Sequence, residues 1–406
     1  MSMATPKVVR GNDTKMGRWV TVTVIVLSTF VAQSFARFTF GLLLPAMKAD
    51  LGISYGLAGW LGTINLAGYL ISTIVTSAAS LRFPPHRLVQ FGLGLATCGI
   101  TILATTRSTP LLLVGMVTGG LGGAAAWIPA PIVAASAFPP EHRGFAMGLC
   151  SMAIGAGIVL ATLFATAVRN IGHNAGLWRP IWMGEATVGL LVTVLSILVL
   201  KPVPLAPGSP PKLSALRTIP TWWAPTLAYA CFGLGYVLFS TFVVAALEKD
   251  AGFGKGHAVW VYALMGTGIA TGALVVGRLS DYFGRRAAMI GSFTSACLGC
   301  LALLTGTEPI VSLATLAFGV GMAGAVVSIA SYIGDHVRPQ EFSAAFGVVT
   351  AGFGVAQMLG PRLGGWMIDR SGTFRWVFVV AASVWAVGAL VAATLPRIGR
   401  LHPRPR

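Results

Sequence analysis

The chain has 406 residues, of which 55% are hydrophobic and only 10% are charged, and its mean hydropathy is +0.80. Soluble domains carry about 25% charged residues, so this composition excludes an ordinary soluble protein. The 28 basic and 11 acidic residues give a net charge of +17. The basic residues lie at the ends of apolar runs and in the tails, so no segment remains for a basic nucleic-acid-binding module. We therefore expect a polytopic membrane protein that does not bind nucleic acid.

The apolar runs are long enough to cross a hydrocarbon core of about 30 Å as helices. The polar residues 1–17 precede a first run that is too long for a signal peptide, so we expect it to remain as an anchor. Charged or Pro-containing breaks divide the runs into twelve predicted helices: residues 19–47, 55–80, 87–106, 110–137, 143–168, 176–200, 222–247, 257–279, 286–305, 309–333, 342–368 and 374–395.

The longest polar break covers residues 201–221, is rich in proline and separates the helices six and six. It predicts an N-terminal unit at residues 1–200, a cytoplasmic linker at 201–221 and a C-terminal unit at 222–406. Residues 140–148 resemble residues 339–347, and both segments precede the fifth helix of their half. This weak repeat indicates a duplication.

One loop carries a dense charged pattern. Residues 277–286 read GRLSDYFGRR, with Gly277 and Gly284 at the expected bends. Asp281 can accept bonds from helix-start amides or pair with an arginine, while Arg285 and Arg286 would lie near anionic headgroups. An ordinary basic loop on the positive, inner side is the alternative reading.

This string resembles the signature cytoplasmic loop of the major facilitator superfamily, G-x-L-[AS]-D-x-x-G-[RK]-[RK]. A second pattern, RF followed by LLPAM at residues 37–47 and GWLGTINLAGYL at residues 59–70, resembles a bacterial branch of that superfamily. The resemblance implies an all-α integral membrane protein with twelve helices in two pseudosymmetric six-helix bundles. It also implies that the 277–286 loop is a gate that latches near Arg143 and Gly144.

The distribution of lysine and arginine favours cytoplasmic termini, because most of these residues outside the spans fall on that side. Together with the resemblance, this predicts a multi-pass protein of the bacterial inner membrane.

Arg37 lies inside the first apolar run, where a cation costs about 2.5 to 3.5 kcal/mol. We expect it to face a cavity, although snorkelling to the outer headgroups is the alternative. Arg362 either lines the same cavity or caps the outer end of its helix. Two cavity arginines would suit an anionic solute. By resemblance, further substrate-binding candidates are Asn65, Trp127, Tyr229, Tyr236, Ser328, Tyr332 and Gln357.

Glu185 is the carboxylate lying well inside a predicted span, where it could carry a proton or hydrogen-bond a neighbouring helix. The five cysteines lie in predicted spans and form no disulfide framework. Since no P-loop, HExxH or nucleophile elbow occurs, we expect neither an enzyme nor a cofactor or metal.

We predict a monomeric secondary transporter whose partners are the lipid bilayer and a small, anionic organic solute moved by alternating access. A multidrug or toxic-compound exporter is one alternative, and a non-transporting membrane sensor or scaffold is the other. Import or export, and a coupling proton or ion, stay open.

Overall fold

The computed structural model describes residues 15–139, 142–171, 175–203, 219, 221–337 and 339–396, and no strand occurs in this part of the chain. The N-terminal helices are α1 (Lys15–Thr29), η1 (Phe30–Phe38), α2 (Thr39–Leu51), α3 (Tyr55–Ala79), α4 (Pro85–Thr105), α5 (Thr109–Trp127), α6 (Ala130–Ser136), α7 (Arg143–Ile171), η3 (Ala175–Leu177) and α8 (Trp178–Val199). The C-terminal helices are α9 (Trp223–Lys249), α10 (Lys255–Phe283), α11 (Arg285–Leu303), α12 (Ile310–His336), α13 (Pro339–Ser371) and α14 (Arg375–Ala393).

Eleven helical spans among the described residues are long and apolar enough to cross a membrane. The first is a single 36-residue span, Met16–Leu51, made of α1, η1 and α2, and the fourth joins α5 and α6. The remaining long helix is α13, which has 33 residues and contains Pro361. The twelve helices predicted from the apolar runs are thereby confirmed.

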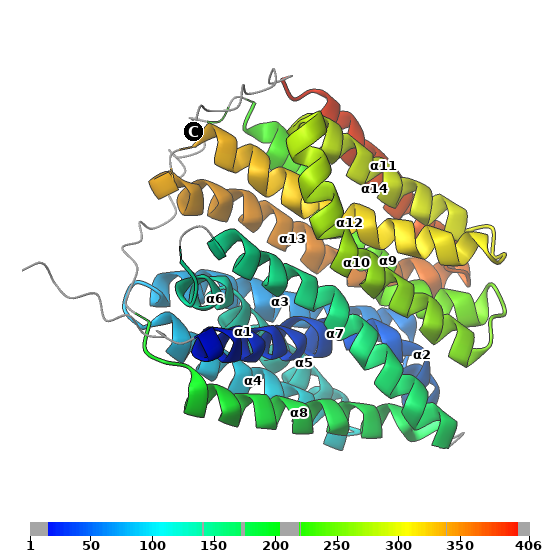
Figure 1. Ribbon diagram of the computed structural model, residues 1–406. Coiled ribbons are helices and arrows are strands. Elements are labelled where there is room, and N and C mark those ends of the chain that lie inside the picture. Colours follow the sequence, from blue (N-terminus) through cyan, green and yellow to red (C-terminus); the bar gives the residue numbers. More distant parts are fainter. Residues whose placement is uncertain are drawn as a thin grey trace, which may run out of the picture.

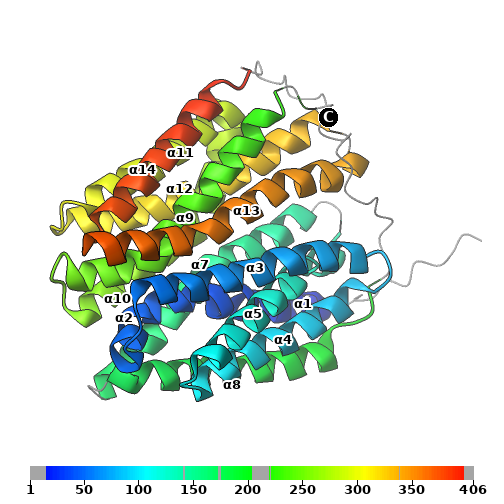
Figure 2. The ribbon, with the colours of Figure 1, turned by 180° about the vertical axis from the view of Figure 1, so that it is seen from behind.

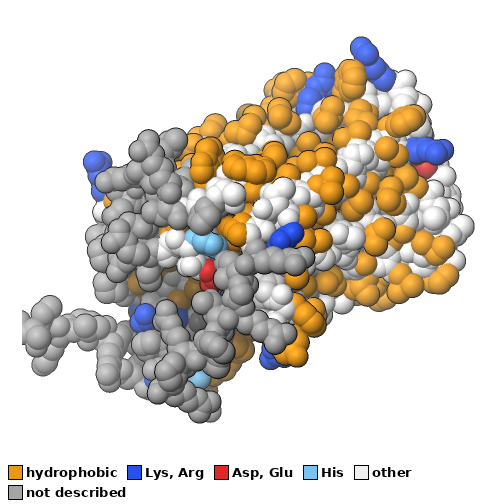
Figure 3. Space-filling view, turned by 90° about the horizontal axis from the view of Figure 1, so that it is seen from above, with side chains coloured by type: hydrophobic (Ala, Val, Ile, Leu, Met, Phe, Trp, Pro, Cys, Tyr) orange, Lys and Arg blue, Asp and Glu red, His pale blue; other side chains and the backbone are white. Residues whose placement is uncertain are grey.

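The outer surface of these helices suits lipid. Hydrophobic side chains are spread over the coloured part of the face in Figure 3, and the lysines and arginines visible there are few. A large exposed apolar surface of this kind marks contact with a membrane. Examples of side chains more than half exposed are Ile74, Val75, Leu190, Leu191, Leu198, Leu313 and Leu390.

The helices pack as two groups that lie side by side, α1–α8 and α9–α14 (Figures 1 and 2). Within the groups, α5 packs on α3 and α4, and α12 packs on α10 and α11. Between the groups, α3 contacts α13, α7 contacts α10, and α2 contacts α9. Most of the predicted linker, residues 201–221, lies outside the described residues, so the division at that segment remains a proposal.

Glycines bring the helix backbones close together. A Cβ atom on Gly120 of α5 would collide with the backbone carbonyl of Asn65 in α3, and one on Gly155 of α7 would collide with the carbonyl of Gly266 in α10. Because lipid provides no hydrophobic force between helices, such close backbone packing is a main source of their association.

The two groups meet over the half of the molecule that carries the predicted outer loops, which we call the outer side. The contacts run from Arg169 and Glu248, whose charged atoms are 3.8 Å apart, inward to Leu70 of α3, which lies against Gly354 of α13. Toward the inner side, a Cβ atom on Gly148 of α7 would meet nothing within 4 Å. The arrangement is therefore closed on the outer side.

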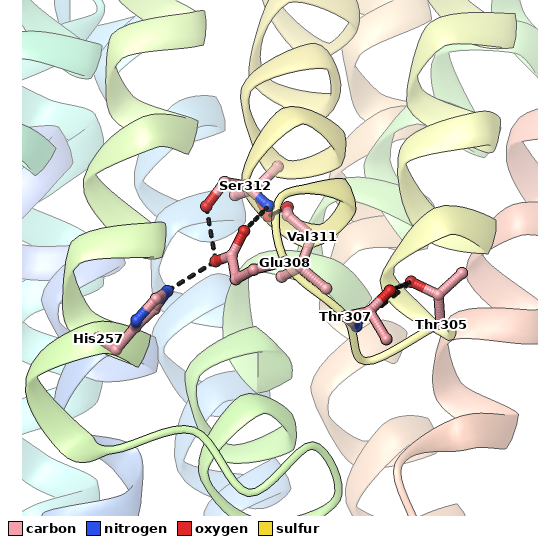
Figure 4. A network of polar contacts seen from close by, with 7 residues as sticks. His257, Thr305, Thr307, Glu308, Val311 and Ser312 are labelled. Carbon is pink, nitrogen blue, oxygen red and sulfur yellow. Dashed lines mark hydrogen bonds and ion pairs between the residues drawn. The ribbon is translucent and has the colours of Figure 1, made fainter.

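A small polar network fixes the outer ends of α10 and α12 (Figure 4). The Glu308 carboxylate lies 2.6 Å from His257 Nε2 and accepts a bond of 2.8 Å from the Ser312 hydroxyl. Partial burial raises the pKa of Glu308, but the bonds from His257 and Ser312 outweigh it and hold the pKa below its ordinary value. Glu308 is therefore an ionised cap for the start of α12 at neutral pH.

We expect Gly120→Ala to destabilise the protein, because the added methyl group must push α5 away from the Asn65 carbonyl. Overpacking of this kind costs about 1 to 3 kcal/mol. The matched control is Gly148→Ala, whose methyl group enters open space. A thermal unfolding measurement in detergent should show a lower Tm for Gly120→Ala only. Equal Tm values for the two variants would contradict the packing described.

Candidate functional site

Arg37 lies on a π-helical segment within the first span. In η1 the backbone N–H of Thr39 bonds the carbonyl of Ser34, five residues earlier, which is the π-helical pattern. Such segments are rare and occur frequently at functional sites. The neighbouring side chains Phe35, Ala36 and Phe38 are buried, whereas Arg37 is partly exposed.

The Arg37 guanidinium is held by neutral groups from three helices. Nη1 donates to Gln33 Oε1 at 2.8 Å, and Nη2 donates to Tyr236 Oη at 2.6 Å and to Gln357 Oε1 at 3.0 Å. The guanidinium carbon also lies 4.1 Å from the centre of the Tyr69 ring. We call Arg37, Gln33, Tyr69, Tyr236 and Gln357 the arginine cluster. It joins both groups of helices and excludes the snorkelling alternative for Arg37.

The arginine cluster keeps donors available. The Tyr236 hydroxyl donates to Gln357 Oε1 at 2.6 Å, so this oxygen accepts from two groups. The buried Gln357 Nε2 has no hydrogen-bond partner among the described residues. No described carboxylate forms an ion pair with Arg37. A cation beside an unused N–H donor makes a positive, hydrogen-bond-donating centre.

A cavity of about 40 Å³ touches the cluster and is lined by Arg37, Asn65, Met116, Tyr236 and Pro361, among others. This is room for little more than a water molecule, whereas sites for small organic ligands measure about 300 to 1,000 Å³. The Asn65 amide lines the cavity, but its nitrogen bonds the carbonyls of Ala36 and Met116 at 3.1 and 2.9 Å. It therefore ties α3 to η1 and α5.

Aromatic rings extend from the arginine cluster along α9 and α13. Phe232 stacks on Tyr236 with ring centres 5.1 Å apart, and Tyr229 stacks on Phe353 at 4.6 Å. We call Tyr229, Phe232 and Phe353 the aromatic wall. Tyr229, predicted as a substrate residue, is thus joined to Tyr236 through stacked rings.

The other predicted residues lie elsewhere. Tyr332 is fully buried in the last turns of α12 with its ring 4.3 Å from that of His336, and the Ser328 hydroxyl is buried one turn earlier. Trp127 is half-buried at the end of α5. None of these side chains contacts the Arg37 guanidinium.

Arg362 belongs to a contact between α3 and α13 near the outer side. Its guanidinium carbon lies 5.2 Å from the centre of the Trp60 ring. Nearby, the Asp369 carboxylate accepts from the backbone N–H groups of Tyr55 and Gly56 at 3.1 and 2.7 Å. We call Tyr55, Gly56, Trp60, Arg362 and Asp369 the outer seam. Arg362 therefore lies near the outer end of its helix, as the second alternative expected, and it is not part of the arginine cluster.

Sequence reasoning missed Gln33, Tyr69 and Asp369. Gln33 precedes Arg37 by four residues, which places both on one helix face, and it is a polar residue in an apolar run. Tyr69 stood in the quoted GWLGTINLAGYL pattern without being selected. The capping of α3 by Asp369 depends on contact between distant helices and leaves no local signal.

The predicted gate differs from expectation in one respect. Helix α10 continues to Phe283, so Gly277 lies inside the helix and its role as a bend was wrong, while Gly284 forms the turn with φ of +94°. Arg285 pairs with Asp281 and with Asp335, the latter at 2.9 Å. Arg286 is the second residue of α11. Contact of Asp281 with Arg143 and Gly144 would need the inner ends closed, so it remains a prediction.

Glu185 of α8 is buried, with 2% of its surface exposed. Its Oε1 accepts a hydrogen bond of 2.8 Å from Thr39 Oγ1 at the end of η1. The hydrogen bond to a neighbouring helix, one of the two roles predicted for Glu185, is therefore present. It leaves the proton-carrier prediction open.

Comparison with known proteins gives one family match. The family model described as "Uncharacterised MFS-type transporter YbfB" matches residues 29–393. Among curated proteins, the chain is 26% identical over 388 residues to monocarboxylate transporter 13 of Rattus norvegicus, covering 92% of this chain and 88% of that protein. It is also 26% identical over 383 residues to the chloramphenicol resistance protein of Streptomyces lividans, covering 90% of this chain and 92% of that protein.

Among solved structures, the chain is similar to a bacterial homologue of the human lysosomal transporter Spinster. The TM-score is 0.77 at 16% sequence identity, with 93% of this chain and 97% of that chain covered. The xylose transporter XylE of E. coli gives a TM-score of 0.72 at 15% identity, with 94% and 100% covered. These two likenesses concern the fold.

We expect Asp369→Asn to open the outer seam, because a neutral amide binds the α3 N–H groups less strongly than a carboxylate does. Charge-assisted bonds at a helix start contribute about 1 to 2 kcal/mol, so the outward-open population should rise by roughly 10-fold. The measurement is the spin-label distance between Ser108→Cys and Thr305→Cys, on outer loops of the two groups, with the native cysteines replaced.

The matched control is Asp250→Asn. Asp250 accepts from the Phe374 N–H at 2.7 Å within the C-terminal group, so it does not join the two groups. Its substitution should leave the distance distribution unchanged. An unchanged distribution in Asp369→Asn as well would contradict the gating role of the seam.

We expect Asp281 to approach the start of α7 when the outer side opens. In an Asp281→Cys/Arg143→Cys variant, oxidative cross-linking should be weak in the arrangement described and stronger when Asp369→Asn is added. The reason is that opening the outer side closes the inner ends of α7 and α10. Equal cross-linking in the two backgrounds would rule out the latch.

Proposed function

Because the chain belongs to the major facilitator superfamily, we propose that it is a secondary active transporter of a small organic anion, working by alternating access. The observation that carries the proposal is the arginine cluster. A guanidinium at membrane depth is held by neutral oxygens of Gln33, Tyr236 and Gln357 rather than by a carboxylate. An anion is the ligand that such a centre binds most favourably.

The cluster provides for both recognition and movement. Arg37 comes from the N-terminal group, while Tyr236 and Gln357 come from the C-terminal group. A carboxylate that bound the guanidinium fork would compete for the donors that now reach across to α9 and α13. Binding would thereby weaken the bonds between the groups and allow them to move, which is the differential interaction that alternating access requires.

The aromatic wall suits the organic part of the substrate. Tyr229, Phe232 and Phe353 present ring faces beside the cation. We propose that the carboxylate binds Arg37 and that an apolar or aromatic portion packs on these rings. Similarity to monocarboxylate transporters agrees with this substrate class.

We further propose that the protein works as a monomer in a bacterial inner membrane with both termini in the cytoplasm. Both groups that contribute to the arginine cluster belong to one chain, which supports a monomer. The bias of basic residues supports the orientation.

The second candidate is export of an uncharged or cationic toxic compound, which the similarity to a chloramphenicol resistance protein favours. Against it, the residues around the candidate site include a cation and no ionised partner for it. The two functions differ in the charge of the compound that binds.

We expect substitutions of Arg37 to reduce anion binding and transport. Arg37→Lys keeps the charge but loses the planar fork and should weaken binding by about 10-fold. Arg37→Ala removes the hydrogen bonds between the guanidinium and the bound anion. Hydrogen bonds to charged groups contribute about 1.5 to 3 kcal/mol, so binding should weaken by about 100-fold. The measurements are thermal-shift binding of a carboxylate panel to purified protein, followed by flux in proteoliposomes.

The control is Arg362→Lys, which alters an arginine of the outer seam and leaves the arginine cluster intact. It should keep carboxylate binding near the wild-type value. The Arg37 variants should also fold, because the Tyr236 to Gln357 bond does not need the guanidinium. Normal carboxylate binding by Arg37→Ala, or stabilisation by cations alone, would give preference to the multidrug function.

A further inference from the structure

Glu185 and Thr39 form a contact whose hydrogen atoms can be counted. The Thr39 hydroxyl has one hydrogen, yet two acceptors lie within reach: Glu185 Oε1 at 2.8 Å and the Ser34 carbonyl oxygen at 3.5 Å. The second carboxyl oxygen, Glu185 Oε2, is buried and has no hydrogen-bond partner among the described residues.

The two protonation states use this contact differently. An ionised Glu185 would take the one Thr39 hydrogen and would leave a charged oxygen buried without a donor, which costs several kcal/mol. A neutral carboxylic acid supplies its own hydrogen to Thr39 Oγ, and the Thr39 hydroxyl can then turn to the Ser34 carbonyl. The acid is therefore the form that this geometry accommodates.

Among the described residues, no cation forms an ion pair with Glu185. The charged or titratable side chains that the structure describes on α8, and on the elements packed against it, are Arg18, Arg37, Lys48, Asp50, His86, Arg87, Cys98, Arg143, Cys150, Arg169 and Arg179. None of them forms a hydrogen bond or ion pair with Glu185. Arg37 donates to Gln33, Tyr236 and Gln357 of the arginine cluster. Arg179 pairs with Asp50 at 2.7 Å, and Arg169 lies 3.8 Å from Glu248.

We propose that Glu185 is the coupling-proton site of this protein, and that Thr39 transmits its protonation state to the π-helical segment that carries Arg37. The identity of the coupled solute rests on the proposed function, whereas the proton site at Glu185 is argued from its own contacts. Glu185 takes one proton from water when the contact with Thr39 opens, and it holds that proton as a carboxylic acid in the outward-closed form.

The connection to Arg37 runs through the backbone of η1. Thr39 bonds the Ser34 carbonyl through its N–H and approaches it with its hydroxyl, and Arg37 lies between these two residues. Loss of the proton would pull the Thr39 hydroxyl toward the carboxylate and away from Ser34. It would thereby loosen the segment that holds Arg37 against Tyr236 and Gln357.

The direct test needs no substrate. Infrared spectra of the protein in lipid nanodiscs at pH 7 should contain the C=O stretching band of a buried carboxylic acid. The band should be missing from Glu185→Gln and retained in Glu308→Gln, because Glu308 is an ionised surface carboxylate. In Thr39→Val the band should move to higher frequency, since the acid loses its acceptor. An acid band equal in wild type and Glu185→Gln, or no such band in either, would overturn the proposal.

A transport assay separates this proposal from the proposed function. With the carboxylate that gives the largest thermal shift, Glu185→Gln should exchange labelled for unlabelled solute at near the wild-type rate. It should lose accumulation driven by a pH gradient. Gradient-driven accumulation that survives in Glu185→Gln would overturn the proton site and leave the anion site standing. An acid band at Glu185 in a wild-type protein that binds no carboxylate would overturn the anion site and leave the proton site standing.

Discussion

The rest of the structure depends on the placement of one cation, Arg37, inside the membrane. Its cost of about 2.5 to 3.5 kcal/mol, even on insertion scales, must be offset by partners. The partners are the side-chain oxygens of Gln33, Tyr236 and Gln357 and the face of Tyr69. These groups are neutral, so they solvate the guanidinium without cancelling its charge. The same bonds hold the two groups of helices together, which links the charge of the site to the position of the groups.

Close helix packing explains why this link can control movement. On the outer side, Asp369 caps α3 across the two groups, and glycines such as Gly59 and Gly365 bring the α3 and α13 backbones into contact. At the inner end of α7, by contrast, a Cβ atom on Gly148 would meet nothing within 4 Å. Rigid, closely packed contacts favour two discrete arrangements over gradual deformation.

The sequence was sufficient for the spans and for Arg37, because a charged residue in a long apolar run is a local signal. Tyr236 and Gln357 were predicted because they lie on helices that line the cavity in related transporters, and both accept hydrogen bonds from Arg37. Other features depend on distant contacts. The π-helix of η1 has no periodicity signal, and Arg362 could be assigned to the outer seam only once Trp60 lay opposite it. Gly277 was expected to form a bend, yet helical bonding continues to Phe283 because Gly284 alone makes the turn.

In the function proposed, Arg37 carries a positive charge that no described carboxylate pairs with, and this charge selects anions. The most direct measurement is calorimetric binding of two ligands with the same carbon skeleton, a carboxylate and its uncharged primary amide, to wild-type protein. We expect the carboxylate to bind about 10- to 100-fold more tightly, as loss of hydrogen bonds to a charged group implies. Equal affinity for the acid and the amide would contradict a role of the Arg37 charge in selecting anions.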